Sequence, residues 1–159
     1  MLLLDRLKES APARIITTAS AAHEGAQIPF DDLNADRSYR GFRRYGESKL
    51  ANILFTRELA HRLEGSGVTA NAFHPGLVAT SFNRNNGLIA SLAMSALSVF
   101  ARTPQQGAAS LVWLAASPEA AAINGAYICD KQQRTPSAAA RDRAAARRLW
   151  QISEQQCAI

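Results

Sequence analysis

Two short apolar segments separated by one long amphipathic helix constrain the fold of this chain most. Residues 13–19 and 68–73 are rich in β-branched and small apolar side chains and end at turn residues, which is typical of buried strands. Between them, residues 41–63 place leucine and isoleucine at helical spacing. Strands that alternate with helices pair in parallel through right-handed crossovers. The sequence therefore predicts an α/β fold, a doubly wound parallel sheet covered on both faces.

The remaining segments add one strand and several helices. We expect a third strand over residues 125–128, helices over residues 1–9, 104–116 and 137–151, a loop over 23–36, and over 81–102 a loop that leads into an apolar helix. Ser137 is the expected cap of the last helix. Parallel sheets are usually buried at most edges. Three strands in 159 residues therefore predict a single partial domain, residues 1–159, that holds about half of such a sheet.

Composition excludes several classes of protein. Hydrophobic residues make up 47% of the chain, which is too many for a disordered protein. Cys129 and Cys157 are too few for a disulfide framework or a cysteine metal cluster, so no metal is expected. The apolar start is cut off by Asp5 and Arg6 and does not predict a signal peptide. Since residues 88–101 are shorter than the ~20 residues of a membrane span, we expect a cytoplasmic location, with peripheral membrane association as the alternative.

The charge balance is basic but does not by itself indicate a partner. Lys and Arg number 18 against 13 Asp and Glu, a formal net charge of +5, and the densest basic region is 134–148. No aromatic residues are interleaved there, so the stacking platforms of a single-strand binder are missing. We expect a solvated helix face and no nucleic-acid partner, and keep nucleic-acid binding as a third hypothesis with a steep salt dependence as its test.

One pair of side chains on the long helix suggests chemistry. Tyr45 and Lys49 are four residues apart and therefore share one helix face. A free phenol, with a pKa near ~10, is a poor base at neutral pH, but a nearby ammonium group favours the phenolate. Such a pair can donate a proton to, or accept one from, an alcohol or carbonyl. An ordinary helix with a buried tyrosine and a solvated lysine has the same spacing, so the pair alone leaves both interpretations open.

Two further features lie where the predicted strands end. Ser20 follows the first strand, and Pro75 and Gly76 turn the chain after the second, with Thr80 beyond them. Open α/β sheets bind ligands at the carboxyl ends of their strands. A crossover helix between two parallel strands would bring Ser20, the Tyr45–Lys49 pair and the Pro75–Gly76 turn to one rim.

The sequence resembles the second half of a short-chain dehydrogenase/reductase, and within that family the retinol-dehydrogenase-like group. Residues 13–23 are similar to the family's catalytic-serine strand, 45–59 to its active-site helix and 74–80 to its nicotinamide-contacting turn. Residues 125–127 and 148–150 resemble its last strand and C-terminal helix. The resemblance covers almost the whole chain. It implies a partial Rossmann-like sheet and a cofactor that is NADP or NAD, with NADP favoured.

The resemblance also implies roles for individual residues. Ser20 would hydrogen-bond the substrate oxygen, Tyr45 would exchange a proton with it, and Lys49 would favour the phenolate and hold the nicotinamide ribose hydroxyls. The turn that contacts the cofactor would be shaped by Pro75, Gly76, Val78 and Thr80. The apolar side chains of Leu88, Ile89, Leu92, Met94, Leu97 and Phe100 lie where family members build a substrate lid, which suggests a hydrophobic alcohol, aldehyde or ketone. A packed core helix is the equal alternative for this stretch.

The family's phosphate-binding glycine loop is expected outside this chain. No glycine precedes Gly25, and the only Gly-x-Gly, at 65–67, comes before a strand and is typical of a helix-ending turn. The strand 13–19 would then be an exposed edge, so we expect low stability or self-association. We also expect the chain alone to be inactive as an enzyme, and a non-catalytic remnant or interaction module is the alternative function. We expect His23 and His61 on the surface and His74 in a structural role.

Overall fold

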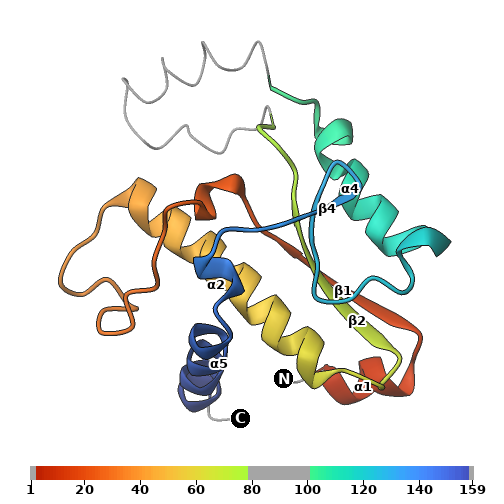
Figure 1. Cartoon of the computed structure of the whole chain (residues 1–159), viewed down its shortest axis with the longest axis horizontal. Coiled ribbons are helices and arrows are strands. Elements are labelled where there is room, and N and C mark those ends of the chain that lie inside the picture. Colours follow the sequence, from red (N-terminus) through yellow and green to blue (C-terminus); the bar gives the residue numbers. More distant parts are fainter. Residues whose placement is uncertain (1–2, 79–100, 158–159) are drawn as a thin grey trace.

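The computed structural model describes residues 3–78 and 101–157, in which four strands form one sheet (Figure 1). The strands β1 (Ala13–Thr18), β2 (Val68–His74), β3 (Tyr127–Cys129) and β4 (Gln132–Arg134) lie in that order. The pairs β1–β2 and β2–β3 are parallel, whereas β3 and β4 form an antiparallel hairpin. The predicted α/β class and the three parallel strands are confirmed, and β4 is an addition that the sequence did not predict.

Helices cover both faces of the sheet, as predicted. They are α1 (Leu4–Glu9), α2 (Gly41–Arg62), α4 (Pro104–Ala116) and α5 (Arg143–Cys157), with 3₁₀ turns η1 (Ala21–His23), η4 (Pro118–Ala120) and η5 (Ala139–Arg141). Successive residues of β2 show the two faces: Ala72 packs in a cluster with α2 and α5, and Phe73 packs with Leu114 of α4. Figure 1 shows α2 and α5 on one side of the strands and α4 on the other.

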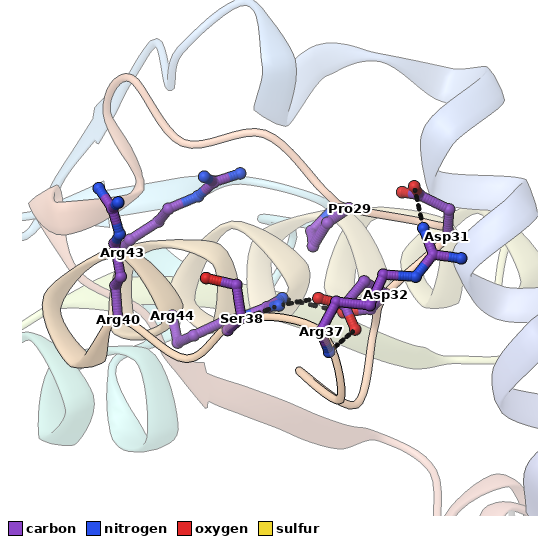
Figure 2. A pocket seen from close by; sticks show the side chains of 8 residues that line it. All are labelled: Pro29, Asp31, Asp32, Arg37, Ser38, Arg40, Arg43 and Arg44. Atoms are coloured by element: carbon purple, nitrogen blue, oxygen red, sulfur yellow. Dashed lines mark hydrogen bonds and ion pairs between the residues drawn. The ribbon is translucent and has the colours of Figure 1, made fainter.

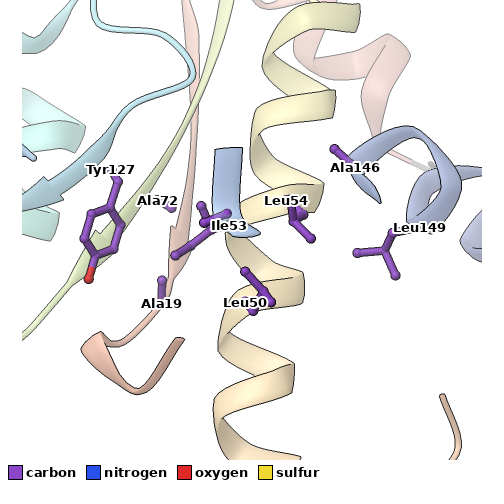
Figure 3. Packing of buried hydrophobic residues seen from close by; sticks show 9 residues of the cluster. Ala19, Leu50, Ile53, Leu54, Ala72, Tyr127, Ala146 and Leu149 are labelled. Atoms are coloured by element: carbon purple, nitrogen blue, oxygen red, sulfur yellow. The ribbon is translucent and has the colours of Figure 1, made fainter. Parts of the chain in front are cut away.

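The core between the sheet and α2 fixes which way the long helix is turned. Leu50, Ile53 and Leu54 are each 1% exposed, and burial of such side chains stabilises the fold by about 1.5–3 kcal/mol apiece. In Figure 3, Ile53 lies toward the sheet residues Ala19 and Ala72, and Leu54 lies on the side of α5. Because this stripe faces the core, the neighbouring face, which carries Tyr45 and Lys49, is directed along the end of β1.

The C-terminal helix begins six residues later than the sequence predicted. Ser137 does not cap α5; its Oγ accepts the N–H of Ala140 at 3.3 Å in the short η5 turn, whose N-cap position is Ala138. The cap of α5 is Asp142, whose carboxylate accepts the N–H groups of Ala144 and Ala145 at 2.8 and 3.0 Å. Both residue types are good helix caps, so the sequence alone did not distinguish the two starts.

Part of the prediction falls outside the described residues. Thr80 and the apolar side chains between Leu88 and Phe100 belong to the segment 79–100, which the structure does not describe. The predicted loop and apolar helix over 81–102, and the substrate-lid interpretation, therefore stay predictions. In the described ranges 3–78 and 101–157, no helix has the length and apolar character that crossing a membrane requires.

Candidate active site

Ser20 stands at the point where β1 gives way to η1. The parallel pairing extends one residue past β1, since the N–H of Ala19 donates to the carbonyl of Phe73 at 2.8 Å. The Oγ of Ser20 then accepts the N–H of Ala22 at 3.2 Å and caps the turn. This contact uses a lone pair of the hydroxyl and leaves its hydrogen for donation to another oxygen.

Lys49 connects Tyr45 with the end of β1. Its Nζ lies 5.5 Å from the centroid of the Tyr45 ring, one helical turn away. The same Nζ donates to the carbonyl of Thr18 at 3.5 Å, and Asn52 donates to that carbonyl at 3.0 Å. Thr18 precedes Ser20 by two residues. The structure therefore brings the tyrosine–lysine pair of α2 to the strand end from which Ser20 emerges.

A glycine allows α2 to approach the serine turn closely. A Cβ atom at Gly46 would lie 2.6 Å from the carbonyl oxygen of Ala22, which is closer than real Cβ contacts come. Gly46 follows Tyr45 directly and is buried. The contact fixes the separation between Tyr45 on the helix and the turn that Ser20 caps. The sequence analysis did not identify this residue, because a single glycine inside a helix gives no sign of its partner.

The turn after β2 lies next to the turn after β1. Gly76 has φ +81°, a conformation that glycine adopts without strain. The Nδ1 atom of His74 accepts the N–H of Gly76 and the N–H of Ala21, each at 3.4 Å. The pKa of His74 is lowered by burial and, secondarily, by the charge of Arg102, which favours the neutral ring that can accept. His74 thus links the serine turn to the Pro75–Gly76 turn.

Val78 continues the turn toward α4. It forms an isolated parallel bridge with Arg102, and the N–H of Arg102 donates to the carbonyl of Leu77 at 2.7 Å. A Cβ atom at Gly107 on α4 would lie 2.5 Å from a methyl carbon of Val78, so the absence of a side chain there makes room for the valine. Of the residues predicted to contact the cofactor, Pro75, Gly76 and Val78 lie at this end of the sheet, and Thr80 is outside the described residues.

The expectation that His23 lies on the surface is wrong. His23 is fully buried, and its ring contacts Tyr127 edge-on with centroids 5.1 Å apart. Its Nε2 accepts the N–H of Ser137 at 3.2 Å, so the proton must be on Nδ1, which donates to the carbonyl of Ser20 at 2.7 Å. The second partner is 114 residues away in the chain, and no local pattern in the sequence identifies it.

The other histidine expected on the surface does lie there. His61 is exposed at the end of α2 and pairs with Glu64 at 3.0 Å.

Tyr127, the neighbour of His23, is also buried. Burial raises the pKa of its phenol to about 12.

A charged pocket of about 180 Å³ lies beside the start of α2 (Figure 2). Its lining consists of Pro29, Asp31, Asp32, Arg37, Ser38, Arg40, Arg43 and Arg44. Arg44 is paired with Asp32 at 2.5 Å and with Glu47 at 3.0 Å, and Arg37 is paired with Asp31 at 3.3 Å. The pocket contains none of the predicted site residues. The Arg44–Asp32 pair connects the loop before α2 to the helix, whereas the Arg37–Asp31 pair lies within that loop.

The side chains at the strand ends fit the nicotinamide end of a dinucleotide. Lys49 spends one long contact on Thr18 and has further N–H groups for ribose hydroxyls. Ser20 keeps a hydrogen to donate, and the Gly76 turn presents backbone at the same end of the sheet. These groups come from three elements that are far apart in sequence and meet at the carboxyl ends of β1 and β2.

Comparison with known proteins identifies the family. A family model described as enoyl-(acyl carrier protein) reductase matches residues 10–130. Retinol dehydrogenase 14 of Homo sapiens is 45% identical over 156 residues, covering 96% of this chain and 46% of that protein. Retinol dehydrogenase 12 of Mus musculus is 44% identical over 152 residues, covering 96% and 48%. The chain therefore spans about half the length of these curated relatives.

Solved structures agree with the sequence comparison. A Mycobacterium Paratuberculosis protein of known crystal structure superposes with a TM-score of 0.68 and 31% identity, covering 90% of this chain and 49% of that one. A short chain dehydrogenase from Burkholderia cenocepacia J2315 in complex with NADP gives a TM-score of 0.53 and 26% identity, covering 83% and 47%. The fold, the matched family model and the relatives agree, and the chain belongs to the short-chain dehydrogenase/reductase family.

Proposed function

We propose that residues 1–159 form the catalytic half of an oxidoreductase that moves a hydride between a nicotinamide cofactor and a hydrophobic alcohol, aldehyde or ketone. The observation that carries the proposal is the position of Lys49, between the ring of Tyr45 and the end of β1. A lysine on an ordinary solvated helix face would extend into water and would not donate to a carbonyl at a strand end. This position supports a role for Lys49 in holding the ribose beside the reacting oxygen.

The roles of the side chains follow from their chemistry. The cofactor, when bound, supplies or accepts the hydride. Tyr45 exchanges a proton with the substrate oxygen, and the cation of Lys49 stabilises the phenolate form that this exchange requires. Lys49 also donates to the ribose hydroxyls. The hydroxyl hydrogen of Ser20 donates to the substrate oxygen and holds it near Tyr45.

The cofactor is proposed to be NADP in preference to NAD. Two solved relatives that resemble this chain, the Burkholderia cenocepacia dehydrogenase and Pseudomonas aeruginosa RhlG, were determined with NADP. The second superposes with a TM-score of 0.57 and 29% identity. Pro75, Gly76 and Val78 lie in the turn proposed to contact the nicotinamide, and Thr80, which lies outside the described residues, is assigned to the cofactor by the family resemblance alone.

The substrate and setting are argued from the relatives and the composition. The curated relatives are named retinol dehydrogenases, and retinol is an apolar alcohol. The apolar residues from Leu88 to Phe100 would suit such a substrate. We propose a cytoplasmic protein with peripheral membrane contact as the route to an apolar substrate, and no nucleic-acid partner. Self-association through β1 is a further part of the proposal.

Cofactor binding tests the proposal directly. NADPH is titrated into the chain while energy transfer from its two tryptophans is recorded. We expect saturable transfer that weakens at least about tenfold in Lys49→Met, the loss expected when one charge-assisted hydrogen bond is removed. Lys8→Met removes an equal charge from α1 and is the matched control. Equal affinity of Lys49→Met and the unaltered chain would contradict the assignment of Lys49.

The alternative function is a non-catalytic remnant that keeps the surface of the fold. The feature that favours it is the position of the only Gly-x-Gly of the sequence. This segment lies before β2 and forms a turn at the end of α2, where it is no phosphate-binding loop. The same titration discriminates the two functions. Absence of any saturable NADPH response in the polypeptide expressed from its own gene would favour the remnant.

A further inference from the structure

The hairpin between β3 and β4 places a carboxylate next to the end of β2. Asp130 and Lys131 form its turn, with φ 52° and 59°, the left-handed values that a two-residue hairpin turn requires. Cys129, immediately before Asp130, is in register with His74. Asp130 therefore stands at the carboxyl end of β3, one strand away from the turn that follows β2.

Asp130 holds Arg102 through both of its oxygens. One guanidinium nitrogen donates to Oδ2 at 3.0 Å, and the other donates to Oδ1. This bond to Arg102 is the main cause that lowers the pKa of Asp130, and its counterpart raises the pKa of Arg102. Both groups are therefore charged at neutral pH. A two-point contact between planar groups fixes orientation as well as distance.

Arg102 in turn covers the turn after β2. A Cβ atom at Gly76 would lie 2.7 Å from Nε, 2.8 Å from Cδ and 2.9 Å from Cζ of Arg102. The backbone of Arg102 adds the hydrogen bond to Leu77 and the bridge to Val78. One arginine thus contacts three consecutive residues, with its side chain over the first and its backbone against the other two.

We propose that Arg102, oriented by Asp130, is a positioning residue that holds the Pro75–Gly76 turn in the shape needed to receive the nicotinamide. The inference rests on the proposed function for the role of the turn. The contacts of Arg102 with Asp130 and with residues 76–78 carry the rest of it. The side chain of Arg102 is 35% exposed and that of Asp130 is 52% exposed. An ion pair this exposed contributes little to global stability. Its effect is local, because the pair determines where the guanidinium lies over Gly76.

The experiment uses the isotope-labelled chain and two variants. Asp130→Asn removes the charge with almost no change of shape, and Arg102→Met keeps the aliphatic stem but removes the guanidinium. Asp31→Asn is the matched control, because Asp31 belongs to an exposed ion pair with Arg37 at 3.3 Å that does not contact the turn. The readouts are the amide signals of Gly76, Leu77 and Val78 and the hydrogen exchange of the Arg102 amide.

The backbone amide of residue 102 donates to the carbonyl of Leu77. We expect the hydrogen of this amide to exchange about fivefold faster in both variants, because an exposed two-point ion pair is lost. Amides of Ile53 and Leu54 in the core should exchange as in the unaltered chain. Asp31→Asn should leave the turn signals unchanged. Unchanged exchange of the Arg102 amide and unchanged Gly76 signals in both variants would overturn the proposal.

A second readout separates this inference from the function on which it rests. Reduced nicotinamide mononucleotide is added, because it carries the nicotinamide and ribose without the adenosine end. In the unaltered chain we expect the nucleotide to shift the amide signals of Gly76 and Val78. In Arg102→Met we expect it to shift the amide signal of Lys49 but no longer that of Gly76. An unaltered chain with no response to the nucleotide contradicts the proposed function, whereas the exchange rates decide the positioning role independently.

Discussion

Gly46 and Ala22 are in contact at the place where the long helix meets the serine turn. The space for a Cβ atom at position 46 is taken by the carbonyl oxygen of Ala22, 2.6 Å away. Tyr45 precedes Gly46, and Ser20 caps the turn that contains Ala22. The distance between Tyr45, the proposed proton donor, and the hydroxyl of Ser20 therefore depends on position 46 having no side chain.

Gly46→Ala tests this contact. Alanine is the better helix former, but its methyl group would push against backbone, and overpacking of this kind costs about 1–3 kcal/mol. We expect a net loss of stability in urea unfolding. Gly41→Ala is the control, because a Cβ atom there meets only the Cε1 and hydroxyl oxygen of Tyr39, each at 3.9 Å. A Gly46→Ala chain at least as stable as the Gly41→Ala chain would contradict the close approach.

His23→Phe tests the buried histidine. Phenylalanine fills the space but leaves the N–H of Ser137 without its acceptor, while the carbonyl of Ser20 keeps the backbone N–H of residue 23, and a buried unsatisfied polar group costs about 1–3 kcal/mol. The same change at the exposed His61 should alter stability by less than about 0.5 kcal/mol. Thermal and urea unfolding of the two variants gives the comparison. Equal stabilities would show that His23 does not link the two segments.

The stability of the chain should fall when the solution becomes mildly acidic. Burial, then Arg102, lower the pKa of His74 from its ordinary 6.5, and His23 acts in the same direction, whereas Asp130 and Glu24 raise it. The folded chain therefore binds fewer protons here than the unfolded chain. The stabilising contribution is complete above pH 6.5 and is lost as the pH falls through the lower folded value.

His74→Asn removes that titration while keeping an acceptor oxygen for Ala21 and Gly76. Unfolding free energies measured between about pH 7.5 and pH 5 should decline in the unaltered chain and decline less in the variant. Carboxylates such as Asp130, whose pKa is lowered, act in a more acidic range. Parallel pH profiles for the two chains would count against His74 as the responsible group.

The edge of the sheet at β1 should promote self-association. Among the described residues, β1 has β2 as its only neighbouring strand. Ala13 and Ala19 donate their N–H groups toward β2, so alternation directs the N–H of Thr18 away from it. We expect concentration-dependent association in sedimentation experiments, reduced by Thr18→Pro, which removes that donor. A single monomeric species at every concentration would contradict the expectation.

The parts of the fold that could be predicted are those with a local signal. The β-branched run before Thr18 and the leucine–isoleucine stripe of α2 locate β1 and the helix to within two residues. Burial on one face produces such periodicity. Gln132–Arg134 carries no such signal, because all three residues of β4 are exposed and its turn has no glycine. A strand formed only by backbone pairing leaves no pattern in the side chains.

The same difference separates the site residues that were anticipated from those that were missed. Tyr45 and Lys49 are detectable because their spacing on a helix is itself the functional feature. His23 and Arg102 act through partners 114 and 28 residues away, Ser137 and Asp130. Only the folded chain brings such pairs together. Ser137 shows a further limit, since this good capping residue lies five residues before Asp142, the cap that α5 uses.

Hydride transfer by the Tyr45→Phe variant tests the central claim most directly. The polypeptide expressed from its own gene is supplied with NADPH and a hydrophobic aldehyde, and loss of the reduced nicotinamide is followed spectroscopically. The account predicts that Tyr45→Phe lowers kcat at least about 10²-fold, the contribution of a positioned proton donor. Tyr39→Phe, at a residue 76% exposed, should leave kcat unchanged. An active polypeptide whose rate is the same with phenylalanine at position 45 would contradict the account.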